Sequence, residues 1–463
     1  MTMGTLGMVA EAVGGTLIGT DAGFDSVSTD SRSLEPGQLF FALRGVRHNA
    51  AEFARDAAAA GAAGVVIEER QSIDLPQIHV ADAGEALRSF ATMWRKRFSL
   101  PLVAVTGSNG KTTVKEMVGT ILRTHFAGPG DDAGVLVTWG NLNNHIGVPI
   151  TLLWMRESHR AAVIEMGASA KHEIARLAAI AAPTVAIITN AGPAHLGGFG
   201  GTLKDVAEAK GELFAGLPAG SIAIINRDDP FYGYWRSLRK DISYRSFGLS
   251  PEADYRAVEV QASGVRSLGF RLLTPTAGIP VELPMSGGHN VRNALAAAAA
   301  SLAAGASLQA VRDGLAQMAN VAGRLRAEPG PAGSTIFDDS YNANPGSVAA
   351  AIQFLAGLDG QRWLVLGGMA ELGPDAAALH REVGVLAAQS GIDRFYCVGE
   401  LTRPAAEGFG PDARWYADVT ELAEVLRPRM TADVHLLVKG SRSAGLERLV
   451  QLVTGRGDTA GVH

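Results

Sequence analysis

The feature that most constrains the fold of this 463-residue chain is a repeated alternation of short apolar runs with segments of helical periodicity. From Leu102 onward the apolar runs read "LVAVT", "AAVIEMG", "TVAIITN" and "SIAIIN", and each is followed by a loop and a periodic stretch. Such alternation is typical of a parallel β-sheet with helices packed on its faces. It restarts further on with "STIFDD", "RWLVLGG", "RFYCVG" and "VHLLVKG". The chain is therefore predicted to be an α/β protein with more than one sheet.

The length of the chain excludes a single hydrophobic core, since cores stop growing beyond about 250–300 residues. One domain boundary is predicted near residue 99, where "RFSLPLVAV" leads through Pro101 into the first apolar run, and a second lies around 319–323. Before the second boundary, a strand-rich stretch, 244–284, precedes "GGHNVRNALAAAAASLAAG", which we expect to form a buried helix. The predicted domains are 1–99, 100–320 and 321–463.

Composition and charge exclude several classes of protein. Hydrophobic residues make up 47% of the chain and charged residues 19%, which indicates a folded rather than a disordered protein. The formal charge of -5 does not fit a protein that binds nucleic acid or anionic lipid, so a small-molecule substrate is favoured. The single cysteine, Cys397, excludes a disulfide framework and fits a reducing cytoplasm. With no charged leader and no apolar tract of about 20 residues, we expect a cytoplasmic protein without membrane insertion.

The segment "AVTGSNGKTTVKE", 104–116, lies between an apolar run and a helical stripe formed by Val114, Val118, Ile121 and Leu122. It nearly matches the phosphate-loop pattern G-x-x-x-x-G-K-[ST], but Val105 stands where the first glycine belongs. The pattern leaves three interpretations open: a degraded phosphate loop, a coincidental match, or a phosphate loop with its own glycine spacing. The placement of Gly-Lys-Thr-Thr at a helix start favours nucleotide binding over a merely tight turn.

The loop and the first helical turn supply the candidate nucleotide contacts, which are Gly107, Ser108, Asn109, Gly110, Lys111, Thr112 and Thr113. The glycines let backbone N–H groups turn inward toward phosphate oxygens. Lys111 can reach the outer phosphates, and the Thr112 hydroxyl can hold Mg²⁺. Thr113 and Lys115 are weaker candidates.

Three further polar residues lie beyond the carboxyl ends of other predicted strands. Open α/β sheets bind their ligands at these strand ends. Glu165 ends the run "AAVIE", and its carboxylate could be an Mg²⁺ ligand or a capping group. His195 lies in the loop after "TVAIITN", where a histidine is ordinarily a surface residue. Lys210, in "TLKDVAEAKGELF", is ordinarily interpreted as a solvated helix lysine.

The segment "INRDD" follows another strand, and its Asn226 and Asp229 could read a purine ring. It resembles the N-K-x-D base-reading motif of GTPases, with Arg227 in place of the lysine. The segment supports an alternative function, a P-loop small-molecule kinase or a nucleotide switch, although a switch would not need two more domains of comparable size. A nucleotide-binding module without catalytic activity is a third hypothesis.

The segments "TGSNGKTT", "EMGA", "GPAHLGGFG", "AEAKGELF", "GGHNVRNALAA" and "AGRLR" occur in the order found in the Mur ligase family, which the chain resembles over nearly its whole length. These are the ATP-dependent amino-acid ligases of bacterial cell-wall synthesis, and their phosphate loop has its glycine two positions later than the common pattern. A second set is similar to the branch that joins D-alanyl-D-alanine to UDP-N-acetylmuramoyl-tripeptide: "GNLNNHIGVPITLL", "DDSYNANPGSV", "MAELG", "LHREVG" and "VKGSRSAGLE". The Asp-Asn-Pro-Arg signature of the branch that adds diaminopimelate does not occur.

The resemblance implies a plan of three domains. An α/β N-terminal domain would bind the uridine nucleotide, a central P-loop ATPase with a mostly parallel sheet would bind ATP, and a Rossmann-like C-terminal domain would bind ATP and D-Ala-D-Ala. It implies ATP and two Mg²⁺ ions as cofactors. The γ-phosphoryl group would pass to the carboxylate of UDP-MurNAc-tripeptide, and the amine of D-Ala-D-Ala would attack the acyl phosphate. A monomer is the family expectation.

The resemblance also implies roles for single residues. Thr112 and Glu165 would bind one Mg²⁺, His195 would bind a second, and Lys210 would become an anionic ligand as a CO₂-derived carbamate. The implied catalytic residues are Lys111, Lys210, His195 and Arg324. The implied ATP contacts outside the loop are Asn226, Asp229, Asn293, Arg324 and Asp339. The implied substrate contacts are Ser31, Arg32, Asn143, Asn144, Tyr341, Asn342, Asn344, Lys439, Ser441 and Arg442.

Three departures from the family pattern bear on specificity. The chain has Asn-Ala-Ala at 49–51 where Asp-Gly-His is common, Gly368 where "LGDM" has an acid, and His145 where "NNE" has an acid. None touches the phosphate loop or the metal set. They leave fine specificity open, including the third residue of the tripeptide.

Overall fold

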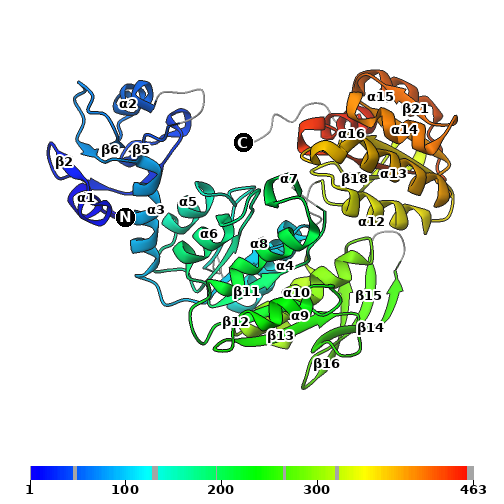
Figure 1. Cartoon of the computed structure of the whole chain (residues 1–463), viewed down its shortest axis with the longest axis horizontal. Helices are drawn as coiled ribbons and strands as arrows, with labels where there is room; N and C mark the ends of the chain where they lie inside the picture. The colour runs from blue at the N-terminus through cyan, green and yellow to red at the C-terminus, as the bar shows by residue number, and fades with distance from the viewer. Residues whose placement is uncertain are drawn as a thin grey trace.

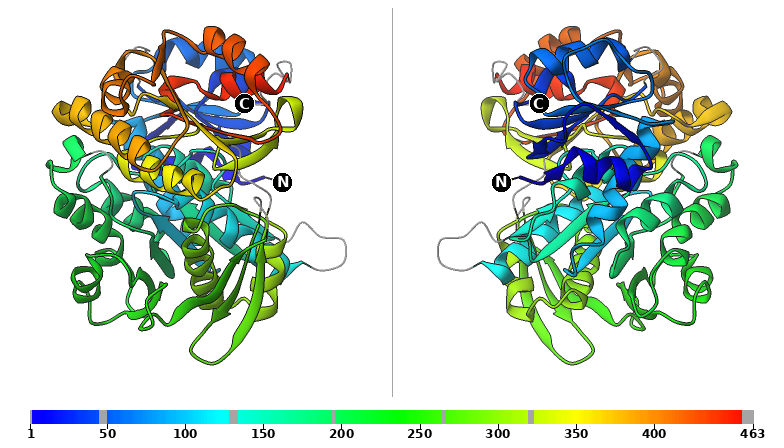
Figure 2. Two further views of the ribbon diagram at one scale, coloured as in Figure 1. Left: turned by 90° about the vertical axis from the view of Figure 1, so that its right-hand side faces the viewer. Right: turned by 90° about the vertical axis from the view of Figure 1, so that its left-hand side faces the viewer.

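The strands of the protein form separate sheets in three successive stretches of the chain (Figure 1). The structure is a computed structural model that describes residues 2–44, 50–127, 134–193, 196–263, 267–318 and 323–455. We call the three parts the first, middle and third lobes. Side views show the first and third lobes on the same side of the middle lobe (Figure 2). The predicted α/β class is confirmed, whereas the predicted boundaries at residues 99 and 320 remain predictions.

The first lobe contains a five-stranded sheet of order β2-β7-β6-β5-β4, in which only β2 is antiparallel to its neighbour, and a small antiparallel pair, β1-β3. Its strands are β1 (Gly4–Thr5), β2 (Thr16–Ile18), β3 (Gly23–Phe24), β4 (Ser26–Ser28), β5 (Gln38–Phe41), β6 (Gly64–Ile67) and β7 (Gln77–His79). Its helices are α1 (Leu6–Val13), α2 (Ala50–Ala59) and α3 (Ala83–Arg95).

Helix α3 packs against the middle lobe as well as its own (Figure 1). Trp94 Nε1 donates to the Met155 carbonyl oxygen at 3.1 Å, and Arg95 Nε donates to the Ala181 carbonyl oxygen at 2.9 Å. One continuous apolar cluster includes buried residues of both lobes, among them Phe90 of α3. The first and middle lobes therefore share a core.

The middle lobe is built on a nine-stranded sheet of order β16-β15-β14-β13-β12-β11-β8-β10-β9, parallel from β9 to β14 and antiparallel at β15 and β16. Its strands are β8 (Leu102–Thr106), β9 (Val135–Val137), β10 (Ala161–Glu165), β11 (Val185–Ile188), β12 (Ile222–Asn226), β13 (Ser243–Gly248), β14 (Tyr255–Ala262), β15 (Leu268–Leu273) and β16 (Gly278–Leu283). Its helices are α4 (Lys111–Phe126), α5 (Gly147–Leu153), α6 (Glu173–Ala181), α7 (Leu196–Phe199), α8 (Leu203–Ala215), α9 (Tyr232–Ser237), α10 (His289–Ala303) and α11 (Leu308–Ala316).

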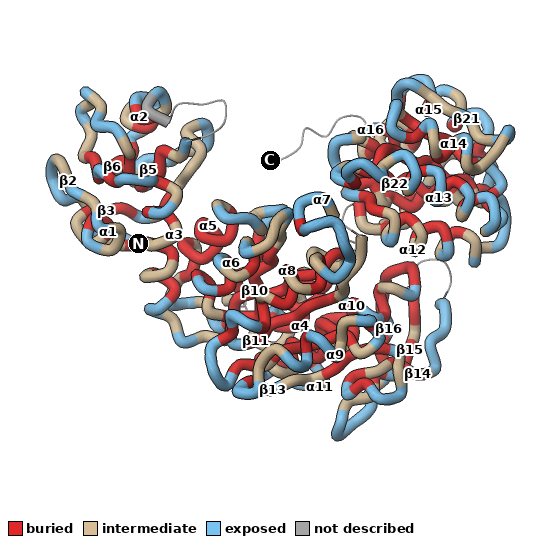
Figure 3. Tube along the Cα trace, viewed as in Figure 1, coloured by how far each residue is buried: buried red, intermediate tan, exposed pale blue. Residues whose placement is uncertain are grey.

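The core of the middle lobe matches the sequence pattern closely. The predicted stripe of Val114, Val118, Ile121 and Leu122 on α4 is fully buried, and the alanine-rich segment forms the buried helix α10. Figure 3 shows these elements enclosed, with exposed residues on the outer helices and loops. The strand order reverses at β8, which lies between β10 and β11, so the carboxyl end of β8 is the expected place for a ligand.

The third lobe has a six-stranded sheet of order β17-β18-β22-β19-β20-β21, in which only β17 is antiparallel. Alternate residues of β22 enter apolar clusters on opposite faces, Leu437 on one and Leu436 and Val438 on the other, so helices cover both faces. Its strands are β17 (Arg326–Pro329), β18 (Thr335–Asp339), β19 (Gln361–Gly367), β20 (Arg394–Val398), β21 (Arg414–Tyr416) and β22 (Val434–Lys439). Its helices are α12 (Pro345–Ala356), α13 (Ala376–Gln389), α14 (Arg403–Phe409), α15 (Val419–Leu426) and α16 (Glu447–Thr454).

Two further properties bear on the predictions from composition. Cys397 lies buried in β20, where burial raises the pKa of its thiol to about 12. The part of the chain that the structure describes contains no helix with both the length and the apolar character needed to cross a bilayer.

Candidate active site

The phosphate loop, residues 107–110, connects β8 to α4 at the carboxyl edge of the middle sheet. Gly107 has a φ of 145°, and a Cβ atom there would lie 2.0 Å from Thr189 Oγ1. Gly110 has a φ of 81°, and a Cβ atom there would lie 2.5 Å from Asn293 Oδ1. Positive φ and close packing both exclude a side chain at these positions. The glycine spacing is therefore required by this loop.

The segment after β11 holds the phosphate loop from outside. Thr189 Oγ1 donates to the Asn109 carbonyl oxygen at 2.6 Å. The Asn190 side chain accepts from the Asn109 N–H at 3.0 Å and donates to its carbonyl oxygen at 3.1 Å. Ser108 Oγ bonds the backbone of Gly192 at 2.9 and 3.0 Å. Thr189 and Asn190 were missed from the sequence, although polar residues at a strand end were the signal that could have found them.

Lys111 and Arg324 approach the loop from opposite lobes. The Lys111 ammonium donates to the carbonyl oxygens of Gly107 at 2.8 Å and Ser108 at 3.2 Å. Burial lowers the pKa of Lys111, with the nearby Arg324 guanidinium adding to that effect and a carboxylate opposing it. Arg324 Nη2 donates to Thr112 Oγ1 at 3.2 Å, and its guanidinium lies 4.2 Å from the centre of the Tyr341 ring. The structure thus brings two predicted catalytic cations to one point.

Glu165 ends β10 beside the loop and is 2% exposed. Its Oε1 accepts from Asn143 Nδ2 at 2.8 Å, whereas its Oε2 is buried and has no hydrogen-bond partner among the residues that the structure describes. Arg324 Nε is also buried, with no hydrogen-bond partner in the described part of the chain. A buried carboxylate oxygen without a donor suits a cation, and a buried guanidinium N–H without an acceptor suits an anion. The two groups fit Mg²⁺ together with a phosphate.

Lys210 on α8 is 2% exposed, so its interpretation as a solvated helix lysine is wrong. Its Nζ lies 4.7 Å from the centre of the Phe199 ring. Burial and, to a smaller degree, the Lys111 cation lower its pKa to about 7, while Glu173 and Glu212 oppose this shift. The face of α8 that carries Lys210 is covered by other segments, which helical periodicity does not reveal.

The predicted Mg²⁺ ligands do not all lie in the described part of the chain. His195, the predicted ligand of a second Mg²⁺, lies outside the described residues. Within those residues there is no group of three or more His, Cys, Asp or Glu side chains that could hold a metal ion. The four predicted Mg²⁺ ligands do not form such a group, because two of them, Thr112 and Lys210, are a hydroxyl and a lysine. Thr113 is buried, and Lys115 Nζ donates to the Thr138 carbonyl oxygen at 2.8 Å and pairs with Glu116 Oε1 at 2.6 Å.

A cavity of about 400 Å³ extends from the phosphate loop between the middle and third lobes. The predicted ATP contacts Asn226, Asp229, Asn293 and Asp339 all line it. All four already bond the protein. Asn226 Nδ2 donates to the Thr189 carbonyl oxygen at 2.9 Å, and Asp229 accepts the N–H groups of Ala191 and Phe231, each at 2.9 Å. Asn293 Nδ2 donates to Asn290 Oδ1 at 2.9 Å, and Asp339 Oδ1 accepts the Leu325 N–H at 3.1 Å. Burial raises the pKa of Asp229. Their contact with a purine stays a prediction.

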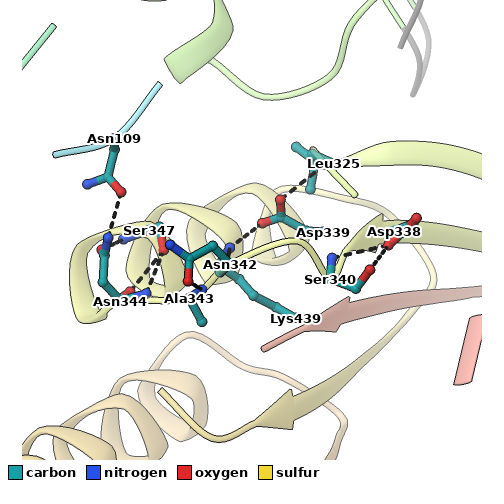
Figure 4. Close-up of polar contacts among 10 residues, drawn as sticks. All are labelled: Asn109, Leu325, Asp338, Asp339, Ser340, Asn342, Ala343, Asn344, Ser347 and Lys439. Atoms are coloured by element: carbon teal, nitrogen blue, oxygen red, sulfur yellow. Dashed lines mark hydrogen bonds and ion pairs between the residues drawn. The ribbon is translucent and has the colours of Figure 1, made fainter. Parts of the chain in front are cut away.

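The facing turn, residues 340–344, follows β18 on the opposite wall (Figure 4). Lys439 Nζ donates to Asp339 Oδ2 at 2.7 Å and to the Asn342 carbonyl oxygen at 2.9 Å. The Lys439 side chain is 3% exposed. The Lys439 ammonium therefore bonds groups of the third lobe in this structure. Its predicted contact with substrate stays a prediction.

Asn344 links the facing turn to the phosphate loop (Figure 4). Its Oδ1 accepts from Ser347 N at 2.9 Å and so caps α12. Its Nδ2 donates to Asn109 Oδ1 at 2.7 Å. The two residues are 235 positions apart in sequence, and the sequence around either residue did not indicate that they would be in contact.

A second cavity, of about 1090 Å³, is lined by all three lobes. Its lining includes Glu85 and Arg88 of the first lobe, Asn143, Asn144 and His145 of the middle lobe, and Tyr341, Ser441 and Arg442 of the third. Lys111, Thr112 and Arg324 line both cavities. A phosphoryl group held in the smaller cavity would therefore face a substrate in the larger one.

The remaining predicted contacts differ in their surroundings. Ser441 is buried and donates through Oγ to the Gly368 carbonyl oxygen at 2.6 Å, whereas the Arg442 side chain is 66% exposed. In the first lobe, Ser31 begins a 3₁₀ turn, and Arg32 bonds both oxygens of Asp30 at 2.9 and 2.6 Å. The uridine contact predicted for Ser31 and Arg32 stays a prediction.

Comparison with known proteins gives similarity over the whole chain. Residues 105–301 match the Mur ligase middle domain, and residues 323–442 match the Mur ligase, glutamate ligase domain. The UDP-N-acetylmuramoyl-tripeptide–D-alanyl-D-alanine ligase of Escherichia coli (strain K12) is 41% identical, over 98% of this chain and 99% of that protein. The ligase of the same name from Bacillus subtilis (strain 168) is 34% identical, over 96% and 97%.

Solved structures agree with the sequence relatives. A crystal structure of MurF from Acinetobacter baumannii superimposes with a TM-score of 0.90 at 33% identity, covering 98% of this chain and 99% of that one. The MurF ligase from Thermotoga maritima in complex with ADP gives a TM-score of 0.82 at 27% identity, covering 93% and 97%.

Proposed function

This chain belongs to the Mur ligase family, and we propose that it joins D-alanyl-D-alanine to UDP-N-acetylmuramoyl-tripeptide with conversion of ATP to ADP and phosphate. The observation that carries this proposal is the meeting of two cavities at Lys111, Thr112 and Arg324. The phosphate loop lines the smaller cavity. Residues of all three lobes line the larger cavity, which has room for two further substrates. The relatives give no support to a kinase or a nucleotide switch. We place the enzyme in the cytoplasm as a monomer.

The chemistry follows from the poor leaving group of a free carboxylate. The terminal carboxylate of the tripeptide attacks the γ-phosphorus of ATP, the bond to ADP breaks, and an acyl phosphate forms. The dipeptide amine attacks the acyl carbon, and the tetrahedral intermediate expels phosphate to leave an amide. Lys111 and Arg324 are placed to stabilise negative charge on the transferring group. To reach a phosphate, Lys111 must exchange its present carbonyl partners for phosphate oxygens.

Thr112 Oγ1 and the unpartnered Glu165 Oε2 are the groups that would hold an Mg²⁺ ion in this site. A bound ion supplies positive charge beside the outer phosphates of ATP. We place a second ion at His195 and Lys210.

Lys210 would serve as a ligand after reaction with CO₂. The neutral amine attacks CO₂, a C–N bond forms, and the amine proton passes to solvent, which turns a cation into a carbamate anion. Burial and the lowered pKa support the neutral amine, and the adjacent Lys111 cation favours an anion at this position. Lys210→Ala should lower turnover at least about 100-fold, a loss typical of groups that stabilise transition-state charge. Near-normal turnover of this variant would rule the carbamate out.

Incubation with ATP, Mg²⁺, UDP-N-acetylmuramoyl-tripeptide and D-Ala-D-Ala tests the proposed function. We expect release of ADP and phosphate that requires both other substrates, together with a pentapeptide product. A stable phosphorylated product would instead indicate a kinase, and nucleotide binding without turnover would indicate an idle module. Parallel assays with lysine-type and diaminopimelate-type tripeptides identify the accepted third residue.

A further inference from the structure

The segment 368–372, after β19, projects into the larger cavity from the third lobe. Met369 and Leu372 are buried in the apolar core of that lobe, at 1% and 4% exposure. Between them, Ala370 and Glu371 line the cavity. The segment is thus anchored at two points and presents a carboxylate between them.

Glu371 has a φ of 62°, in the left-handed region that residues other than glycine rarely adopt. Hydrogen bonds hold the segment that carries it. The Met369 N–H donates to Nε2 of the fully buried His380 at 2.9 Å, and Nδ1 of His380 contacts the Ala376 carbonyl oxygen at 2.7 Å. This pattern fits a neutral imidazole with its proton on Nδ1, and burial lowers the pKa of His380 accordingly. Strained residues held in this way cluster at ligand sites.

The adjacent strand carries the opposite charge. Strand β22 pairs in parallel with β19, so their carboxyl ends lie side by side. Ser441 of the segment after β22 bonds the Gly368 carbonyl oxygen through both its N–H and its Oγ. Arg442 and Ser443 follow it and also line the cavity. One wall therefore presents a carboxylate on one segment and a guanidinium with hydroxyl groups on the next.

Two cations lie at the phosphate-loop end of the cavity, together with Glu165, the carboxylate that would hold Mg²⁺. Lys111 and Arg324 line the cavity where the acyl phosphate would form, and both are cations. An unreacted dipeptide is a zwitterion, with its ammonium and carboxylate at opposite ends. The third-lobe wall carries both charges on neighbouring segments. The other carboxylates that line the cavity are Glu165, which would hold Mg²⁺, and Glu85 and Glu173, which belong to α3 and α6.

We propose that Glu371 binds the ammonium group of the incoming dipeptide, while Arg442 and the adjacent serine hydroxyls bind its carboxylate. This inference rests on the proposed function, because it assigns the site of that reaction's second substrate. His380 is a positioning residue, which acts by fixing the segment that carries Glu371.

Steady-state kinetics of Glu371→Gln test the proposal. The substitution keeps size and removes charge, and loss of a charge-assisted hydrogen bond should raise the KM for D-Ala-D-Ala about 10-fold or more. The KM values for ATP and the nucleotide substrate should stay within about twofold. Glu382→Gln, on the exposed surface of α13, is the matched control and should behave as the unsubstituted enzyme. An unchanged KM for the dipeptide in Glu371→Gln overturns the proposal.

An inhibitor without the ammonium separates recognition from a structural role. N-acetyl-D-Ala-D-Ala should inhibit the unsubstituted enzyme and Glu371→Gln with the same inhibition constant. Equal weakening of this inhibitor would show a general distortion and overturn the proposal. Glu371→Gly relieves the positive φ, so its Tm should be unchanged or higher while its KM for the dipeptide rises. If the unsubstituted enzyme does not ligate the dipeptide at all, the proposed function itself fails, which is a distinct result.

Discussion

Two strand-to-helix turns meet across the smaller cavity, and they are built on different principles. The phosphate loop offers backbone, because its two required glycines exclude side chains and Thr189 and Asn190 hold it from outside. The facing turn is held by side chains, chiefly Lys439 and Asn344. The backbone turn suits a phosphate of any nucleotide, whereas the side-chain turn links the third lobe to the phosphate loop through the hydrogen bond from Asn344 to Asn109.

Two buried lysines near these turns, Lys439 and Lys210, differ in the charge of their neighbours. Lys439 lies beside the Asp339 carboxylate at 2.7 Å. Lys210 lies near the Lys111 cation, and its pKa is lowered to about 7. The buried cation of the third lobe is therefore paired with a carboxylate, whereas burial of Lys210 beside another cation costs stability.

The largest effect is expected from Gly107→Ala in the backbone turn. A methyl group would lie 2.0 Å from Thr189 Oγ1 at a φ of 145°, so the loop must move, and the phosphate contacts predicted for it would be lost. We expect turnover to fall at least about 1000-fold, as when several stabilising donors are displaced together, and ADP binding by calorimetry to be lost. Gly288→Ala is the control, because its Cβ would meet nothing within 4 Å. Normal turnover of Gly107→Ala would show that the loop is not the nucleotide site.

Lys439→Met should have the next largest effect, on stability. Removing one partner of a buried pair leaves the Asp339 carboxylate uncompensated, a change that typically costs about 3–5 kcal/mol. Urea unfolding followed by fluorescence would measure the loss. Adding Asp339→Asn to this variant should recover part of it, and a failure to recover any would mean that the pair is not the source.

Lys210→Met should change stability in the opposite direction when measured without metal and CO₂. Lysine in the unfolded chain has its ordinary pKa of 10.5, whereas burial lowers the pKa of folded Lys210 to about 7. Below pH 7 both states are protonated and the burial penalty is complete. Between the two pKa values the unfolded state binds more protons, so the stability of the unsubstituted protein rises with pH.

The variant should therefore be more stable than the unsubstituted protein by about 1–3 kcal/mol at pH 6, with the gap closing as the pH rises to 9. Thermal unfolding at pH 6, 7.5 and 9 measures this gap. Lys204→Met, on the exposed side of the same helix, should show no such pH dependence. A gap that widens with pH would contradict the assignment of Lys210 as a buried amine.

The smallest effect is expected from Asn344→Ser, which removes the link between the two turns. Serine also caps helices, so α12 should remain and the Tm should change by less than about 2 °C. The shorter side chain cannot reach Asn109, and the KM for ATP should rise about 3–10-fold, as for one lost neutral hydrogen bond. A large fall in Tm would mean that the cap was lost instead, and an unchanged KM would mean that the link has no part in ATP binding.

The sequence predicted what local pattern controls. The buried stripe of α4, the buried helix α10 and the α/β class follow from periodicity. The glycine-rich turn before α4 follows from Gly-Lys-Thr-Thr between an apolar run and a helical stripe. Contacts between distant segments were not predictable in this way. The burial of Lys210 depends on segments that pack over α8, and the pair Asp339–Lys439 joins residues 100 positions apart. The role of Glu371 depends on a backbone conformation that no residue type indicates.

The shared core beneath α3 has a mechanical consequence. Because one apolar cluster runs through the first and middle lobes, the parts that would hold the nucleotide-sugar and ATP form one stiff body. The apolar clusters of the third lobe are its own, and polar contacts such as Asn344 to Asn109 and Arg324 to Thr112 join it to the phosphate loop. Polar contacts of this kind can break and reform during a catalytic cycle. Opening and closing therefore fall to the third lobe, which would carry the second substrate to a reaction centre already set by the other two.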